Sequence, residues 1–345
     1  MPPQILKEPK HTLRSHTYWV ESCVWSPDGE NIATASADKT VRVHDAAGTE
    51  LWKVGHPDWI LSLAYSFTPK RKRLATACLD GRLRILDATG GRVLADILAH
   101  TSSINCINFS PDGNFIATAS YDKTAKIFSV ASGKAVHTVE KHACPVLACV
   151  FSIDSKFLIS GSMRGWVRVT DVSTGKEVYA ARAHDAGVQS IAASATQGLL
   201  ATASTDKSVK VWKLGETGKL TAVTTLKHAE EVTSVTFSPD GMFLASASTD
   251  STARVYEAGC TWEEQARLKG HTDEVNSVCF MSKQPRLLLA TCSDDKLTLV
   301  WDVTKVSVAL KVAQARGARV AAVEPKDPAV TMTSVGDPTD MGGID

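Results

Sequence analysis

Seven histidines recur along this chain of 345 residues at intervals of 40 to 44 residues, and no other feature constrains the fold as strongly. After each histidine, a short run of alternating apolar and polar residues is followed by a turn, a second run, another turn and a third run. Alternation with a period of two predicts β-strands, and the turn Ser-Pro-Asp-Gly, which occurs three times, is typical of tight hairpins. The histidines are His16, His56, His100, His142, His184, His228 and His271.

The repeat length fits a unit of four short antiparallel strands, which takes roughly 40 to 45 residues. Such a sheet cannot bury both faces alone, so the units are expected to pack radially until the ring closes. The sequence therefore predicts an all-β fold, a seven-bladed β-propeller of four-stranded antiparallel blades. We expect an N-terminal extension at 1–9, the propeller at 10–312, and a C-terminal tail at 313–345 that is flexible or bound to a partner.

Two segments compete for the outer strand of the last blade. Residues 10–15 align with the fourth-strand segments that precede the other histidines, and residues 307–312 have the same character and follow blade seven directly. A bare strand edge invites aggregation, so one of them is needed there. We expect the N-terminal segment to close the ring.

Polar residues at constant spacing accompany most of the histidines. In six of the seven units an aspartate precedes the third strand, and a hydroxyl residue lies four positions before it. A buried polar group without a partner costs roughly 1–3 kcal/mol, so these groups are expected to form a linked set. Blade four keeps the hydroxyl, Ser160, but has Arg164 in place of the aspartate. The aspartates are Asp38, Asp80, Asp122, Asp206, Asp250 and Asp295, and the other hydroxyl residues are Thr34, Thr76, Thr118, Thr202, Ser246 and Thr291.

With these residues in these positions, the units resemble WD repeats over roughly residues 12–303. That family places Trp at the end of the third strand, where this chain has His44, Leu86, Phe128, Thr170, Trp212, Tyr256 and Trp301. The resemblance implies a structural network of His, Ser or Thr, Asp and Trp. The set is complete in blade five (His184, Thr202, Asp206, Trp212) and in blade seven (His271, Thr291, Asp295, Trp301).

Composition and charge bear on the compartment of the protein and on the kinds of partner it binds. The formal net charge is +1, so no overall field draws the chain to nucleic acid or an anionic membrane. No run of 18 apolar residues occurs, and the N-terminus lacks the apolar core of a signal peptide. The eight cysteines form no C-x-x-C pair, which favours free thiols in a reducing compartment. We expect a cytoplasmic protein, with a cytoskeletal, ciliary or nuclear location left open.

The repeated histidines and aspartates do not predict an enzyme. Catalytic groups converge on one substrate, whereas these residues recur once per blade around a ring. The sequence has no glycine-rich phosphate loop, no G-x-S-x-G and no H-E-x-x-H. We expect no catalytic residues, no cofactor, no metal site and no small-molecule substrate. A basic residue in six of the third strands is expected to pack its stem between blades: Arg42, Arg84, Lys126, Arg168, Lys210 and Arg254.

The resemblance also implies where a partner binds. In WD-repeat proteins, the loops entering strand one and the loops between strands two and three share one face, the top face. Large apolar groups exposed together commonly mark an interface, and Trp and Tyr are favoured anchors. Blades one to four place Trp19, Trp59, Leu61, Leu79, Tyr121, Leu147 and Met163 there, and blades six and seven place Glu231, Glu274 and Asp294.

The favoured interpretation is a non-enzymatic scaffold that binds other proteins as a subunit of a larger complex. The aromatic half of the top face would bind a segment of the partner, and the acidic half would favour basic residues next to that segment. A reader of peptide tails that uses the aromatic part is one alternative, and cover of the tryptophans by the chain itself is another.

An RNA-associated component is a further alternative. It would use the basic run Lys70, Arg71, Lys72 and Arg73, which lies in a hairpin of the opposite, bottom face; a solvated turn is the simpler interpretation. Arg164 is either an anion contact on the top face or a replacement in an irregular blade.

Overall fold

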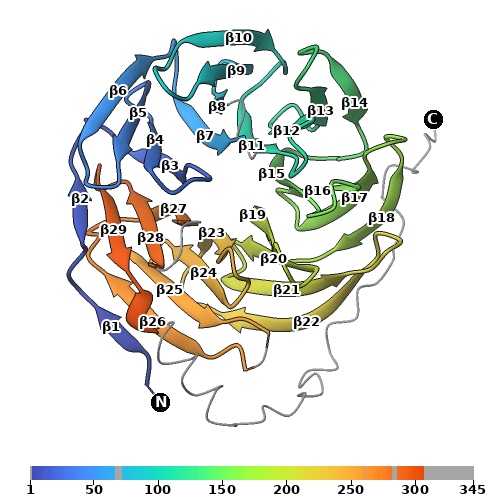
Figure 1. Cartoon of the computed structure of the whole chain (residues 1–345). Helices are drawn as coiled ribbons and strands as arrows, with labels where there is room; N and C mark the ends of the chain where they lie inside the picture. The colour runs from blue at the N-terminus through green and yellow to red at the C-terminus, as the bar shows by residue number, and fades with distance from the viewer. Residues whose placement is uncertain (1, 67–71, 260, 282–285, 307–345) are drawn as a thin grey trace, which may run out of the picture.

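Seven antiparallel sheets stand around a central axis in the computed structural model (Figure 1). The structure describes residues 2–66, 72–259, 261–281 and 286–306. Each blade has four antiparallel strands, with the first strand beside the axis and the fourth at the rim. The predicted all-β, seven-bladed propeller is confirmed.

The strands are numbered along the chain. Blade one contains β3 (Val20–Trp25), β4 (Asn31–Ser36), β5 (Thr40–Asp45) and β6 (Glu50–Gly55). Blade two contains β7 (Ile60–Tyr65), β8 (Arg73–Cys78), β9 (Arg82–Asp87) and β10 (Val93–Leu98). Blade three contains β11 (Ile104–Phe109), β12 (Phe115–Ser120), β13 (Ala125–Ser129) and β14 (Ala135–Val139). Blade four contains β15 (Val146–Phe151), β16 (Phe157–Ser162), β17 (Trp166–Asp171) and β18 (Glu177–Arg182).

Blade five contains β19 (Val188–Ala193), β20 (Leu199–Ser204), β21 (Ser208–Leu214) and β22 (Leu220–Lys227). Blade six contains β23 (Val232–Phe237), β24 (Phe243–Ser248), β25 (Thr252–Glu257) and β26 (Glu264–Lys269). Blade seven contains β27 (Val275–Phe280), β28 (Leu288–Ser293), β29 (Thr298–Asp302) and, from the start of the chain, β2 (His11–Leu13).

The hydrophobic core lies between neighbouring blades. Successive side chains of a strand point to opposite faces of the sheet, and each face meets another blade. The seam between blades two and three, for example, joins Ile85 to Ile104 and Phe109 in one apolar cluster. Because both faces are covered, the second strands are buried almost throughout and read as apolar runs rather than as a strict alternation.

Hydrogen bonds also cross the seams between the innermost strands. The hydroxyl of Ser22 in blade one accepts the backbone N–H of Leu63 in blade two over 3.3 Å, and the same contact recurs at three later seams. At the seam where the ring closes, Cys23 Sγ lies 3.6 Å from Cys279 Sγ. The seven cysteines in the described part of the chain are all free thiols.

The N-terminal segment closes the ring and then adds one strand more. β2 pairs antiparallel with β29, with His11 opposite Val300, so the first residues of the chain supply the outer strand of blade seven. β1 (Gln4–Leu6) pairs in parallel with β26 and makes blade six five-stranded (Figure 1). The competing segment 307–312 and the expected tail 313–345 lie outside the described residues. In the part that the structure describes, no helix is long and apolar enough to cross a membrane.

Candidate interaction face and the hydrogen bonds behind it

Blade five holds the complete polar network. His184 Nδ1 lies 2.8 Å from Asp206 Oδ2, and His184 Nε2 lies 2.7 Å from Thr202 Oγ1. The indole N–H of Trp212 donates to the same Thr202 oxygen over 2.9 Å. Burial acts to raise the pKa of Asp206, but the hydrogen bond and positive charge of His184 lower it well below its usual range. The carboxylate therefore accepts from Nδ1–H, and the network ties the top loops to strands two and three.

Blades one, three and seven form the same His–Asp pair. The distances from Nδ1 to Oδ2 are 2.9 Å for His16 and Asp38, 2.8 Å for His100 and Asp122, and 2.8 Å for His271 and Asp295. In blade seven, the Trp301 indole donates to Thr291 over 2.9 Å, as Trp212 does in blade five. The backbone N–H after each of these histidines also donates to the aspartate, over 3.1 to 3.2 Å. Each carboxylate thus holds a loop as well as a side chain.

Blade two differs from the expectation that His56 and Asp80 share a network. Asp80 Oδ2 accepts from Arg84 Nη2 over 2.7 Å, and the buried His56 Nδ1 has no partner among the described residues. His56 still contacts Thr76 Oγ1, at 3.0 Å. Residue 57 is Pro, which has no N–H to donate to Asp80. Arg84 therefore competes for this carboxylate with the His56 ring but not with a backbone N–H of residue 57.

In blade six, the expectation that His228 and Asp250 share a network is also wrong. Asp250 Oδ2 accepts from Arg254 Nη2 over 2.9 Å, and His228 Nδ1 has no partner in the described structure. The hydroxyl of Tyr256, at the position of the family Trp, lies 3.1 Å from His228 Nε2. Arg254 is buried, so its guanidinium needs an anion, and the nearest carboxylate supplies one.

The third-strand basic residue decides which partner the aspartate takes. In blades three and five this residue is a lysine, whose ammonium donates instead to a backbone carbonyl: Lys126 to Ala99 O over 2.7 Å and Lys210 to Ala183 O over 2.8 Å. In blade one, Glu50 binds Arg42 at 2.7 Å and leaves Asp38 to the histidine. The head groups of these three residues are thus engaged within their own blades, and the packing of the stems between blades stays a prediction.

Blade four has no carboxylate at this position. Arg164 is exposed and makes no ion pair with a described residue, while Arg168 binds Glu177 at 2.5 Å. Among the described residues, His142 Nε2 has a hydrogen bond to Ser160 Oγ, at 2.8 Å. Burial, together with the positive charge of Arg168, lowers the pKa of His142 to about 3, so this histidine is neutral at physiological pH.

The two sets of loops predicted for the top face meet in every blade. The residue before each network aspartate, or before Arg164 in blade four, donates its backbone N–H to a carbonyl in the loop that enters strand one. The bonds are 2.9 to 3.1 Å long. The donor and acceptor pairs are Ala37–Trp19, Leu79–Trp59, Tyr121–Ser103, Met163–Pro145, Thr205–Gly187, Thr249–Glu231 and Asp294–Glu274.

Three aromatic rings gather at blades one and two of this face. The ring centroids of Trp19 and Trp59 are 6.0 Å apart in an edge-on arrangement, and Tyr18 lies 4.8 Å from Trp19 and 6.1 Å from Trp59. Tyr18 is 40% exposed and Trp19 36%. We call these three residues the aromatic cluster. Tyr18 was not predicted, although its position directly before Trp19 is a usable signal.

The other predicted apolar residues surround the aromatic cluster or lie beyond it. Leu79, Tyr121 and Met163 are exposed, whereas Leu61 and Leu147 are half-buried. Blades one to four therefore present a series of large apolar groups to solvent. Among the described residues, the aromatic ring contacts of this cluster are those between its own three members.

Carboxyl groups gather where blades six and seven meet blade one. Burial, reinforced by the charge of Asp294, raises the pKa of Glu21 to about 7. Burial and the charge of Asp294 likewise raise the pKa of Glu274, to which Glu231 contributes. Asp294 accepts from the Asn276 amide over 2.6 Å, yet burial still leaves its pKa raised. We call Glu21, Glu231, Glu274 and Asp294 the acidic cluster; its carboxyl groups repel one another.

The basic run on the opposite face is only partly described. Lys70 and Arg71 lie outside the described residues. Lys72 Nζ binds Asp28 Oδ2 at 2.8 Å, and Arg73 donates to the carbonyl of Val130 over 3.4 Å. Both described members thus have contacts within the chain, which weakens the RNA alternative. No group of His, Cys, Asp or Glu within the described ranges has an arrangement able to hold a metal ion.

A family model described as "WD domain, G-beta repeat" matches the chain seven times, at residues 7–45, 48–87, 91–129, 133–171, 175–213, 220–257 and 262–302. The chain belongs to the WD-repeat family. Propellers of this family are generally non-catalytic and bind other proteins. Each match contains the outer strand of one blade and the first three strands of the next, so the seven matches account for the seven blades of the structure.

Curated relatives match parts of the chain. A "Probable cytosolic Fe-S cluster assembly factor" of Schizosaccharomyces japonicus is 36% identical over 117 residues, which is 33% of this chain and 19% of that protein. The "Probable cytosolic iron-sulfur protein assembly protein 1" of Candida glabrata is 31% identical over 126 residues, 33% of this chain and 37% of that protein. The "Target of rapamycin complex subunit LST8-1" of Arabidopsis thaliana is 43% identical over 54 residues, 15% of this chain and 18% of that protein. The matched regions thus span well under half of each relative.

Proposed function

We propose that this WD-repeat protein is a non-enzymatic, cytoplasmic scaffold subunit whose top face docks a partner segment that carries basic side chains. The single observation that carries the proposal is the position of the aromatic cluster beside the acidic cluster. Tyr18 and Trp19 offer exposed rings beside the half-buried Trp59, and Glu21 lies two residues from Trp19 with a raised pKa. Two kinds of relative, one named as an assembly factor and one as a complex subunit, fit such a role.

The chemistry of the two clusters defines the partner. A cation over an aromatic ring gains roughly 0.5–2 kcal/mol, more where water is excluded. Burial and, after it, repulsion between carboxylates raise the pKa values of Glu21 and Glu274, and a cation near the acidic cluster offsets both effects. A segment with an aromatic or aliphatic anchor and a Lys or Arg a few residues away satisfies both clusters. Its binding is expected to weaken as salt rises.

The arrangement of the histidines supports the absence of catalysis. The His–Asp pairs are spread over blades one, three, five and seven, and each aspartate is held by its own loop. A substrate in contact with one pair is out of reach of the others. The pairs therefore act as supports of the top loops.

The test is to purify the tagged protein with its native partners and to compare variants. Trp19→Ala with Trp59→Ala removes the two large rings and is expected to reduce recovery of the partner at least tenfold. Leu98→Ala is the matched control, because Leu98 is 66% exposed on the outer strand of blade two. Unchanged recovery with the double variant, in a protein that unfolds at the wild-type temperature, contradicts the proposal.

A further inference from the structure

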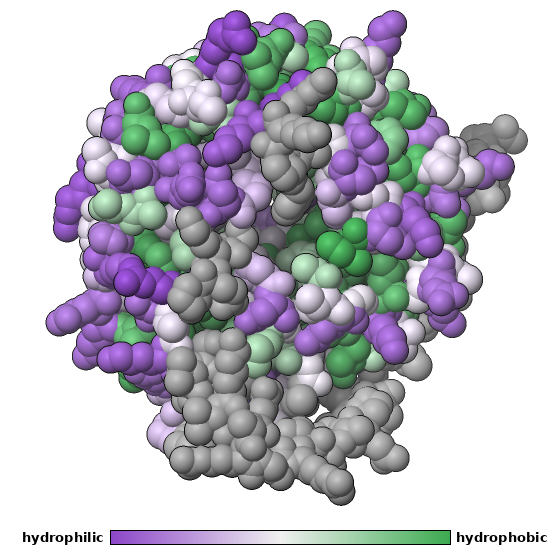
Figure 2. All heavy atoms as spheres, in the orientation of Figure 1, coloured by the Kyte–Doolittle hydropathy of each residue, from purple (hydrophilic) through white to green (hydrophobic). Residues whose placement is uncertain are grey.

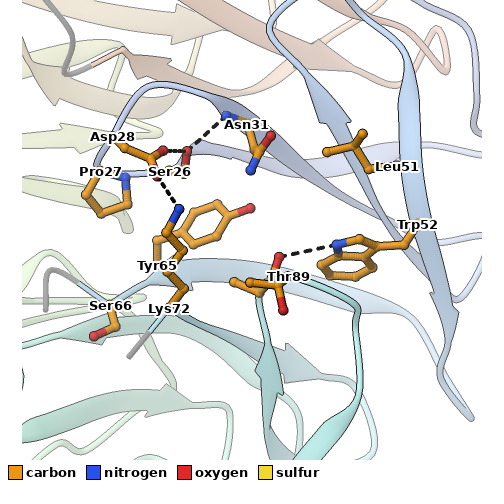
Figure 3. A pocket seen from close by; sticks show the side chains of 11 residues that line it. Ser26, Pro27, Asp28, Asn31, Leu51, Trp52, Tyr65, Ser66, Lys72 and Thr89 are labelled. Atoms are coloured by element: carbon orange, nitrogen blue, oxygen red, sulfur yellow. Dashed lines mark hydrogen bonds and ion pairs between the residues drawn. The ribbon is translucent and has the colours of Figure 1, made fainter. Parts of the chain in front are cut away.

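A cavity of about 610 Å³ opens between blades one and two, away from the top face. Its described lining comes from the turn after β3, from Tyr65, Ser66 and Lys72 of blade two, and from β6 and the turn after β9 (Figure 3). Its volume lies within the roughly 300–1,000 Å³ of pockets that take small ligands. No part of the top-face proposal depends on it.

The tyrosine in this cavity carries a hydroxyl that the fold does not need. Tyr65 is 6% exposed, and its Oη has no hydrogen-bond partner in the described structure. Figure 3 shows the hydroxyl directed into the cavity, toward the space between Asn31 and Trp52. The same register position holds Phe in four other blades: Phe109, Phe151, Phe237 and Phe280. A phenyl ring is therefore enough for packing, and the buried hydroxyl adds a donor at a cost of roughly 1–3 kcal/mol unless it is satisfied.

Further groups converge on the same space. The side-chain amide of Asn31 makes no hydrogen bond to a described residue, and it points into the cavity (Figure 3). The Trp52 indole is fixed by its N–H bond to the carbonyl of Ala88, at 3.2 Å, and forms a flat apolar wall. Leu51, 51% exposed, stands beside it. An apolar wall with a few convergent polar groups is the usual composition of a ligand pocket.

The charges at the rim indicate a neutral ligand. Asp28 and Lys72 are the charged residues in the described lining, and they bind each other at 2.8 Å. Burial keeps the pKa of Tyr65 raised, so its hydroxyl stays protonated and acts as a donor. A charged ligand would have to break the ion pair or stay unpaired.

A second cavity of about 630 Å³ lies between blades four and five and serves as an internal comparison. Its lining has Ala193 at the register position of Tyr65. None of its described lining residues has a buried polar side-chain atom without a partner. The second cavity thus has no orphan donor in its described lining. In blade one the register position of Tyr65 holds Trp25, whose buried indole N–H also lacks a partner in the described structure, but Trp25 is not among the described lining residues of either cavity.

We propose that the cavity between blades one and two binds a neutral aromatic carboxamide. The carbonyl oxygen of the ligand accepts from Tyr65 Oη, its amide pairs with the amide of Asn31, and its ring packs on Trp52 and Leu51. This arrangement satisfies the orphan hydroxyl and uses both hydrogen-bonding functions of the asparagine.

Benzamide is the probe, and its binding is followed by ligand-observed NMR titration of the full chain. A probe of this size in a pocket of this kind is expected to bind with a Kd of about 1 mM. Tyr65→Phe, which copies four other blades, is expected to weaken binding about three- to tenfold. Tyr179→Phe is the matched control: it removes a hydroxyl from the outer strand of blade four, outside this cavity, and is expected to leave the Kd unchanged.

Two further probes test the chemistry. Toluene lacks the amide and is expected to bind more weakly than benzamide and equally well to wild type and Tyr65→Phe. Benzoate carries a charge and is expected to bind more weakly than benzamide. The proposal is overturned if wild type does not bind benzamide at 10 mM, roughly ten times the expected Kd. It is also overturned if Tyr65→Phe matches wild type within twofold, or if toluene or benzoate binds as tightly as benzamide.

Discussion

Blades four and five have the same four-strand architecture, yet they hold their top loops by different means. In blade five, Asp206 binds His184 at 2.8 Å and the next backbone N–H at 3.2 Å. In blade four, Arg164 replaces the aspartate, and His142 keeps its hydrogen bond to Ser160 without a carboxylate partner among the described residues. Both blades nevertheless bury their second strand completely. Apolar packing between blades is therefore sufficient for the fold, and the polar network acts on the loops of the top face.

The contrast extends around the ring. Blades one, three, five and seven form the His–Asp pair, and blades two, four and six do not. In the second group, no carboxylate of the described residues pairs with the buried histidine ring. The folded state is therefore most stable while that ring is neutral. The stabilities of these two groups of blades are expected to respond differently to acid, to removal of a carboxylate and to introduction of a carboxylate.

Acid is expected to have the largest effect. Burial, with a nearby arginine as a second cause, lowers the pKa to about 4 in His56, about 3 in His142 and about 4 in His228. In the unfolded chain these histidines titrate near 6.5, so between pH 6.5 and about 4 the unfolded state binds protons that the folded state does not. The free energy of unfolding therefore decreases as the pH is lowered, by up to about 1.4 kcal/mol per pH unit for each histidine.

Urea unfolding at several pH values between 5 and 6.5, roughly the window in which these histidines differ between the two states, measures this slope. His142→Gln removes one of these three histidines and is expected to reduce the slope by about 1 kcal/mol per pH unit. Glu21 acts in the opposite direction, because its raised pKa makes the folded state bind the extra proton between about 4.5 and 7. An unchanged slope in His142→Gln would show that His142 is protonated in the folded protein.

Asp206→Ala is expected to have the next largest effect. It removes the acceptor of the buried His184 ring, of the Asp185 N–H and of the Ser208 hydroxyl, and should lower the free energy of unfolding by about 3 kcal/mol. Asp185→Ala is the control, since the side chain of Asp185 is 92% exposed and its N–H remains. Equal midpoints of urea unfolding for the two variants would refute a special role of the pair.

Arg164→Asp is expected to have the smallest effect, and a favourable one. The new carboxylate would stand 22 residues after His142, the spacing of the pairs in blades one, three and five. It would gain one hydrogen bond to a buried ring, about 1 kcal/mol, while Trp166 still occupies the place of the hydroxyl that flanks other aspartates. NMR titration should show a higher pKa for His142. Arg164→Ser is the control, because it removes the arginine without adding a carboxylate. Equal free energies of unfolding for Arg164→Asp and Arg164→Ser would mean that the new aspartate does not pair with His142.

Much of the fold follows from local features of the sequence. The histidine spacing and the turn residues predict seven units of four strands, because strand alternation and hairpin geometry are set by neighbouring residues. The outer strand supplied by the N-terminal segment also follows, since 11–13 align with the other fourth strands. The set of Trp212 and Thr202 in blade five follows from the family spacing.

The partners of Asp80 and Asp250 could not be predicted from spacing. Each has a histidine at the proper interval, and each instead binds the arginine four residues later, Arg84 or Arg254. The outcome depends on the free energies of two competing hydrogen-bonding partners brought together by strand pairing and burial. A lysine at the same position reaches a backbone carbonyl and leaves the aspartate to the histidine.

The sequence by itself determined the architecture: seven repeats, their strands and the top-face positions, because these depend on residues close together in the chain. Only the tertiary structure decided which side chains meet across the seams. It placed Tyr18 against both tryptophans, crowded the carboxyl groups of blades seven and one, and left the Tyr65 hydroxyl facing a cavity. The physical reason is that packing of neighbouring blades, rather than the repeat within each blade, fixes the surroundings of these side chains.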